Sequence, residues 1–96
     1  MNLQSAMPVG EITGAGILAR LIETRRESLS RDAANYLLSL RFDESDVSRM
    51  NELSELARSG NLATAEAAEL DSYMHVSNLV AVMQSKARQS LRTLDE

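Results

Sequence analysis

The chain of 96 residues contains no cysteine, no tryptophan, one phenylalanine, two tyrosines and one proline. The absence of cysteine excludes disulfide bonds and thiolate metal sites, and it fits a reducing compartment. With so few aromatic side chains, a core must be built mainly from aliphatic residues, Met and Ala, and the last two specify a single packing poorly. A chain of this length buries about 60–68% of its unfolded surface. We therefore expect one domain with a thin core that a partner would stabilise.

Long hydrophobic runs and a basic stripe are also missing. No window approaches the roughly 18 apolar residues of a membrane span, and residues 1–10 lack the basic and apolar regions of a signal peptide. We expect no membrane association and a cytoplasmic location. The net charge is −4, and the basic residues near the C-terminus fit helix C-terminal placement. We therefore expect no nucleic-acid binding by the chain alone and favour a basic protein as partner.

Apolar residues recur at helical spacing in four segments of the chain. The pattern predicts an all-α fold, a small four-helix domain with helices near 14–27, 31–40, 44–58 and 65–91. Residues 1–11 show no periodicity and are predicted to form a mobile tail. Residues 12–96 are predicted to form a single helical domain.

Capping residues mark where these helices begin and end. Thr13, Ser30 and Asp43 stand where the first three helices need an N-cap. Gly60 supplies the left-handed backbone position that closes the third helix, and Thr64 is predicted to cap the fourth. This short joint predicts a C-terminal antiparallel hairpin of the last two helices.

The last predicted helix is much longer than its hairpin partner. Over 27 residues it would rise about 40 Å, against about 22 Å for the third helix. Its second half is therefore covered either by the first two helices or by another polypeptide. Ser77-Asn78 is the weakest helix-forming pair in this segment, and the helix is either continuous or kinked there. Because the chain is apolar almost all round near residue 80, we predict a symmetric homodimer through this segment. The predicted self-association residues are Leu79, Val80, Val82 and Met83.

No catalytic or metal-binding constellation is present in the sequence. A calcium loop aligned on Gly60 places Glu66 correctly but puts Ala57 and Ala63 at ligand positions, and alanine cannot coordinate a hard cation. His75 is the only histidine, and its neighbours on one helix cannot converge with it as a triad. No Glu-x-x-His pair supports a di-iron site. We expect no enzyme activity, no metal and no cofactor.

Acidic residues cluster at the starts of the third and fourth predicted helices. Complementation of the helix dipole explains carboxylates in first turns. The alternative is an acidic face that meets a basic partner. The residues assigned to that face are Glu44, Glu52, Glu55, Glu66 and Glu69.

Residues 33–91 show a packing and capping pattern carried by four segments: 36–42 (YLLSLRF), 58–62 (RSGNL), 69–73 (ELDSY) and 83–88 (MQSKAR). The pattern resembles a family of small helical bacterial proteins often encoded beside HNH-type endonucleases. The resemblance covers about 60% of the chain and implies an antitoxin-like or accessory partner that docks on the nuclease. It brings no functional residue with it.

Two functions follow as expectations. The first is a non-enzymatic protein-interaction module, antitoxin-like or accessory to a nuclease, that acts through its acidic helical face. The alternative is a structural or regulatory helical homo-oligomer with no dedicated client.

Overall fold

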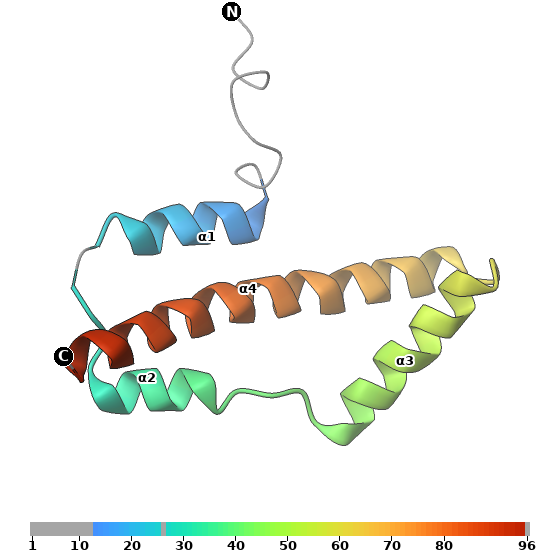
Figure 1. Ribbon diagram of the computed structural model, residues 1–96. Helices are drawn as coiled ribbons and strands as arrows, with labels where there is room; N and C mark the ends of the chain where they lie inside the picture. Colours follow the sequence, from blue (N-terminus) through green and yellow to red (C-terminus); the bar gives the residue numbers. More distant parts are fainter. Residues whose placement is uncertain (1–12, 26, 96) are drawn as a thin grey trace, which may run out of the picture.

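The computed structural model describes residues 13–25 and 27–95, and within these ranges the only regular secondary structure is helical (Figure 1). The helices are α1 (Gly14–Glu23), α2 (Arg31–Leu38), α3 (Glu44–Arg58) and α4 (Thr64–Leu94). The predicted all-α class and the long last helix are confirmed. The predicted tail over residues 1–11 lies outside the described residues.

Three of the predicted helix starts have the expected side-chain caps. The Thr13 hydroxyl, the Ser30 hydroxyl and the Asp43 carboxylate each accept a hydrogen bond from the backbone N–H three residues further on, at 3.0, 3.2 and 2.9 Å. Each bond satisfies a donor that the first helical turn leaves free. These short-range signals therefore fix the starts of α1, α2 and α3.

The joint between α3 and α4 agrees with the prediction at its glycine but not at its threonine. Gly60 has φ +77°, and the N–H of Asn61 donates to the carbonyl of Leu56 at 2.9 Å, which closes α3. The prediction that Thr64 caps α4 is wrong, because Thr64 is already the first helical residue and Ala63 is the N-cap. Since alanine has no side-chain acceptor, the Glu66 carboxylate reaches back to the Ala63 N–H at 3.0 Å.

Helix α4 is the element on which the other described helices pack. It is continuous over 31 residues, a rise of about 46 Å, without a break at Ser77-Asn78. α1, α2 and α3 each contact α4 and do not contact one another. In Figure 1, α1 and α2 flank the C-terminal half of α4 on opposite sides, and α3 diverges from α4 away from the joint. The first two helices therefore cover the second half of α4, one of the two predicted possibilities.

The core is thin. Among the described residues, Ala34, Leu53 and Ala87 are the only buried apolar side chains, and α1 buries none. In Figure 1, α1, α2 and α3 each lie beside α4, and each contacts α4 alone among the described helices. Large apolar side chains that remain 43–67% exposed are Ile17, Leu21, Tyr36, Val47, Met74, Val76 and Leu94. The helices thus form a single layer with apolar residues left on its surfaces.

Helix α1 ends at Glu23, four residues before its predicted end at 27. After α1, the N–H of Leu29 donates to the hydroxyl of Ser90 on α4 at 2.8 Å, and the ammonium of Lys86 on α4 donates to the carbonyl of Arg25 at 3.4 Å. These bonds are made between residues 61 positions apart. The early end is therefore explained by docking on α4, which the local sequence pattern does not reveal.

Helix α2 also ends early, at Leu38 instead of residue 40. The side-chain amide of Gln84 on α4 donates to the carbonyls of Leu37 and Leu40, each at 3.1 Å. Carbonyls at the end of a helix need such donors. Gln84 therefore supplies from α4 the donor that ends α2.

Candidate functional site

A cluster around Arg49 connects α3 to α4. The guanidinium donates two hydrogen bonds to the carboxylate of Glu69, at 2.7 and 2.8 Å, and a third to Glu52 at 2.7 Å. The bond from Arg49 lowers the pKa of Glu69 below its ordinary value, and the two carboxylates raise the pKa of Arg49. The two-pronged geometry is the strongest form of such a contact. This cluster fixes the orientation of α3 on α4.

The residues of the predicted acidic face lie on α3 and on the first turns of α4, but most of them are engaged within the chain. Glu52 and Glu69 bind Arg49, and Glu55 accepts a hydrogen bond from Arg58 at 2.6 Å. Glu66 satisfies the N–H of Ala63. Glu44 is exposed and makes no ion pair with any other residue that the structure describes. Of the five, Glu44 is therefore the carboxylate most available to a partner.

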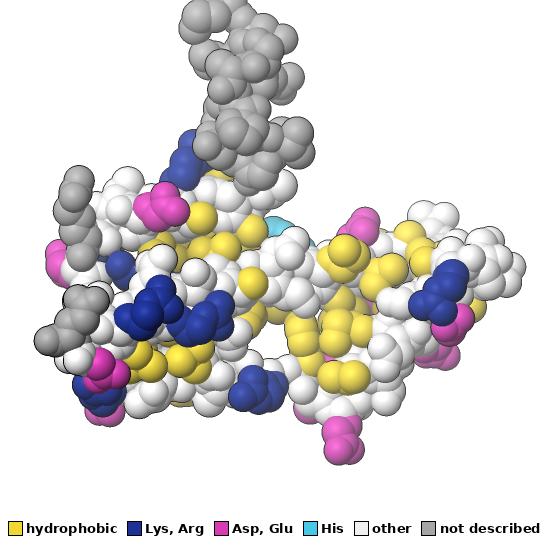
Figure 2. All heavy atoms as spheres, in the orientation of Figure 1, with side chains coloured by type: hydrophobic (Ala, Val, Ile, Leu, Met, Phe, Trp, Pro, Cys, Tyr) yellow, Lys and Arg dark blue, Asp and Glu magenta, His cyan; other side chains and the backbone are white. Residues whose placement is uncertain are grey.

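The charge of the molecule is divided between its two ends. Residues 43–73 contain eight of the 14 acidic side chains and two of the 10 basic ones, a net charge of −6, whereas the rest of the chain has six acids and eight bases, a net charge of +2. The first group makes up α3 and the start of α4, and the second contains α1, α2 and the C-terminal half of α4. In Figure 2, dark-blue side chains lie over the C-terminal half of α4. The molecule therefore has an acidic end and a basic end.

Tyr73 joins α4 to the start of α3. Its hydroxyl donates to the carboxylate of Asp46 at 2.7 Å, and its ring packs edge-on against Phe42 with centroids 5.9 Å apart. The hydrogen bond to Asp46, with partial burial, raises the pKa of Tyr73 above its ordinary value. Sequence reasoning missed this contact, although the scarcity of aromatic residues was a signal that the chain's single Phe and one of its two Tyr would meet.

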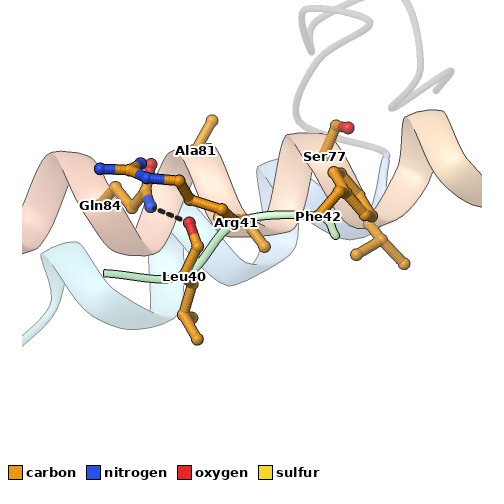
Figure 3. Close-up of a pocket in the computed structure, with 8 residues that line it drawn as sticks. Leu40, Arg41, Phe42, Ser77, Ala81 and Gln84 are labelled. Atoms are coloured by element: carbon orange, nitrogen blue, oxygen red, sulfur yellow. Dashed lines mark hydrogen bonds between the residues drawn. The ribbon is translucent and has the colours of Figure 1, made fainter. Parts of the chain in front are cut away.

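A pocket of about 480 Å³ lies where the segment between α2 and α3 crosses α4 (Figure 3). Its lining contains no carboxylate and no histidine, so it has no acid–base pair for catalysis and is suited to an apolar side chain. A second hollow of about 290 Å³, between α3 and α4, shares Ser77 with it and includes Met50 and Met74. The first pocket is lined by Leu40, Arg41, Phe42, Val76, Ser77, Val80, Ala81 and Gln84.

The predicted self-association residues Leu79, Val80, Val82 and Met83 are all half-buried within their own chain. Val80 lines the pocket beside the segment between α2 and α3. Met83 lines a separate hollow of about 240 Å³ with residues of α1 and α2. Part of each side chain stays accessible, and the structure contains no second copy to test the predicted interface.

His75 lies against the start of α1. Its side chain is exposed, and a Cβ built on Gly14 would stand 2.6 Å from its Cε1 atom. The ring therefore sits where the absence of a side chain at Gly14 permits a close approach. Within residues 13–25 and 27–95, no group of three or more His, Asp or Glu side chains is arranged to hold a metal ion.

Comparison with known proteins gives no relative from which a function could be transferred. No protein-family model matches the chain, and no curated protein or solved structure matches it either. Across the described helices, none is long and apolar enough to cross a membrane. A functional proposal therefore depends on the shape and charge of the chain.

Proposed function

We propose that this chain is a non-enzymatic protein-interaction module, an antitoxin-like or accessory partner of a nuclease, and that it binds a basic protein surface through its acidic end. The observation that carries the proposal is the single helical layer. Stable domains pack two or more layers around a core. Here α1, α2 and α3 contact α4 alone among the described helices, and only three of the described apolar side chains are buried. A partner that supplies a second layer would complete such a core.

The acidic end supports a basic partner rather than a neutral one. Its net charge of −6 over residues 43–73 would attract a positively charged surface and speed the encounter. Within that end, Glu44 is exposed and unpaired among the described residues, whereas Glu52 and Glu69 are already bound to Arg49. We therefore assign Glu44 to the contact with the partner and assign Glu52 and Glu69 to the support of α3.

The test is binding to the purified product of the gene adjacent to the one that encodes this chain, which the resemblance implies is an HNH-type endonuclease. Stopped-flow mixing at increasing salt should show an association rate that falls steeply, because a Debye length of about 10 Å at 0.1 M screens the encounter. The dissociation rate should change much less. Absence of a complex at low salt would contradict the proposal and favour a homo-oligomer without a dedicated client.

A matched pair of variants tests the acidic end itself. Glu44→Gln removes a free charge from it and should lower the association rate about two- to fivefold. Glu23→Gln removes the same charge from α1, at the basic end of the molecule, and should not slow association. Both side chains are exposed, so neither change should disturb the fold. Equal effects of the two variants would mean that only the total charge of the chain matters.

A further inference from the structure

Helix α4 has one long face whose residues stay exposed, although Met74, Ser77 and Asn78 also line the hollow beside α3. At about 100° per residue, the residues of this face recur every three or four positions along the C-terminal two thirds of α4, apart from the adjacent pair Ser77 and Asn78. Ala81, one of them, lies at the edge of this face, where it also lines the pocket beside the segment that crosses α4 (Figure 3). The face consists of exposed residues: Asp71, Met74, Ser77, Asn78, Ala81, Ser85, Arg88 and Arg92.

The middle of this face is made of small side chains. Ser77, Asn78, Ala81 and Ser85 occupy its central turns, and all are exposed. Small residues allow two helix axes to approach to about 8 Å, the lower end of the usual range. A second helix could therefore cross α4 closely at this point.

The charges on either side of these turns indicate which helix would cross α4 at this point. Asp71 precedes the small residues and Arg88 follows them, and neither forms an ion pair with another described residue. They are 17 positions apart in the sequence, about 25 Å along the helix, so they cannot reach each other within one chain. In an antiparallel second copy, Asp71 of one chain meets Arg88 of the other, and the same pair forms again by symmetry.

The midpoint of this pairing coincides with the small residues. A two-fold axis that brings Asp71 opposite Arg88 passes α4 between residues 79 and 80, so that Asn78 lies opposite Ala81 of the other copy. The acidic end of each chain then lies toward the basic end of the other. The pairing of the charges and the close approach of the small residues thus require the same register of the two α4 helices. Either requirement alone would be met by other registers as well.

The same register also gives the exposed Met74 a place to pack. Its side chain is 57% exposed, and it would lie opposite residue 85 of the other copy, beside Ala81 and Gln84, which line the pocket of about 480 Å³. Met is flexible enough to fill such an irregular apolar hollow. Each copy would contribute one Met74 and one pocket.

We propose that two copies of this chain associate through α4, antiparallel, with Asp71 paired to Arg88 across a crossing at residues 77–81 and with Met74 seated in the partner's pocket. This interface lies apart from the half-buried Leu79, Val82 and Met83, which the sequence had suggested. It does not depend on the proposed nuclease partner, because its occupant is a second copy of the same chain, although Asp71 belongs to the acidic end.

Sedimentation equilibrium of the full chain tests the proposal. The monomer has a mass of 10.6 kDa, and we expect twice that mass at tens of micromolar. Asp71→Arg and Arg88→Asp should each raise the dimer dissociation constant about tenfold, because each change breaks two pairs and adds repulsion. The combined variant restores both pairs with reversed sign and should regain the parent dissociation constant. Glu23→Arg, an equal charge change on α1, should leave it unaltered.

Cysteine substitution locates the crossing independently of the charges. The chain has no cysteine, so Ala81→Cys introduces a single thiol near the two-fold axis, and mild oxidation should link two chains. Ser72→Cys places the thiol nine positions earlier, about half a turn round α4, and should remain unlinked. A parent that is still monomeric at about 100 µM, equal cross-linking of the two variants, or failure of the combined charge reversal to restore association would each overturn the proposal. Circular dichroism of every variant separates loss of association from loss of fold.

Discussion

The hydroxyl of Tyr73 on α4 donates to the carboxylate of Asp46 on α3 at 2.7 Å, across 27 positions of sequence. The bond holds the proton on the phenol, so the pKa of Tyr73 lies above its ordinary value of 10.0. A raised pKa in the folded state means that this contribution to stability is complete below pH 10.0 and is lost as the pH rises through the folded value. Loss of the phenol proton therefore weakens the contact in strong alkali.

Ultraviolet titration measures this shift. In a Tyr36→Phe variant the tyrosinate absorbance reports Tyr73 alone, and we expect its midpoint above 10.0. Adding Asp46→Asn removes the negative acceptor and should lower the midpoint toward the ordinary value. An unchanged midpoint after that substitution would show that burial, and not the bond, sets the pKa.

The Arg49–Glu69 pair predicts the acid limb of the stability curve. Arg49 lowers the pKa of Glu69 below its ordinary value of 4.5, so the pair contributes fully above that pH and is lost as the pH falls through the folded value. Urea unfolding of Glu69→Gln should therefore lose less stability on acidification than the parent does. A Glu69→Gln variant that loses as much stability on acidification as the parent would contradict this role of the pair.

The buried hydroxyl of Ser90 predicts that a small substitution at this position causes a large loss of stability. Its side chain is 1% exposed, and its hydroxyl accepts from the N–H of Leu29. Ser90→Ala leaves that donor without its partner and should lower the free energy of unfolding by about 1–3 kcal/mol in urea titrations. Ser85→Ala, on the exposed face of the same helix, should stay within about 0.5 kcal/mol of the parent.

The backbone conformation of Gly60 predicts that a side chain at this position lowers stability through backbone strain alone. Its φ is +77°, and a Cβ placed on it would meet nothing within 4 Å. Gly60→Val should lower the free energy of unfolding by at least about 1 kcal/mol, because a β-branched residue is strained in the left-handed region. Gly60→Asn, which tolerates that region better, should lose less. Equal melting temperatures of the parent and the valine variant would contradict this role.

Local signals in the sequence were sufficient to predict the helices and most of their N-caps. Thr13, Ser30 and Asp43 cap as predicted because each bond spans only three residues. The prediction that Thr64 caps α4 was wrong although its residue type suits a cap. The neighbouring Ala63 takes that position, and its N–H donates to the carboxylate of Glu66. Such competition between adjacent positions is decided by a single side-chain bond.

Contacts between distant residues were not predictable in the same way. Gln84 ends α2 and Ser90 binds the segment after α1, over separations of 44 to 61 residues. Nothing in the spacing of apolar residues identifies such a pair. The acidic face was predicted from charge alone, and its engagement by Arg49 depends on how α3 is oriented on α4. The sequence therefore predicted where charge accumulates, but not which carboxylates remain free.

Because α1, α2 and α3 each rest on α4 and not on one another, each can detach without breaking the contacts of the other two. Native-state hydrogen exchange should then show separate opening events. α1, which buries no residue, should open at the lowest free energy, and the centre of α4 should exchange last because its opening dismantles all three packing contacts. A ligand that binds α1 would accordingly slow hydrogen exchange in that helix and leave the opening of α2 and α3 unchanged.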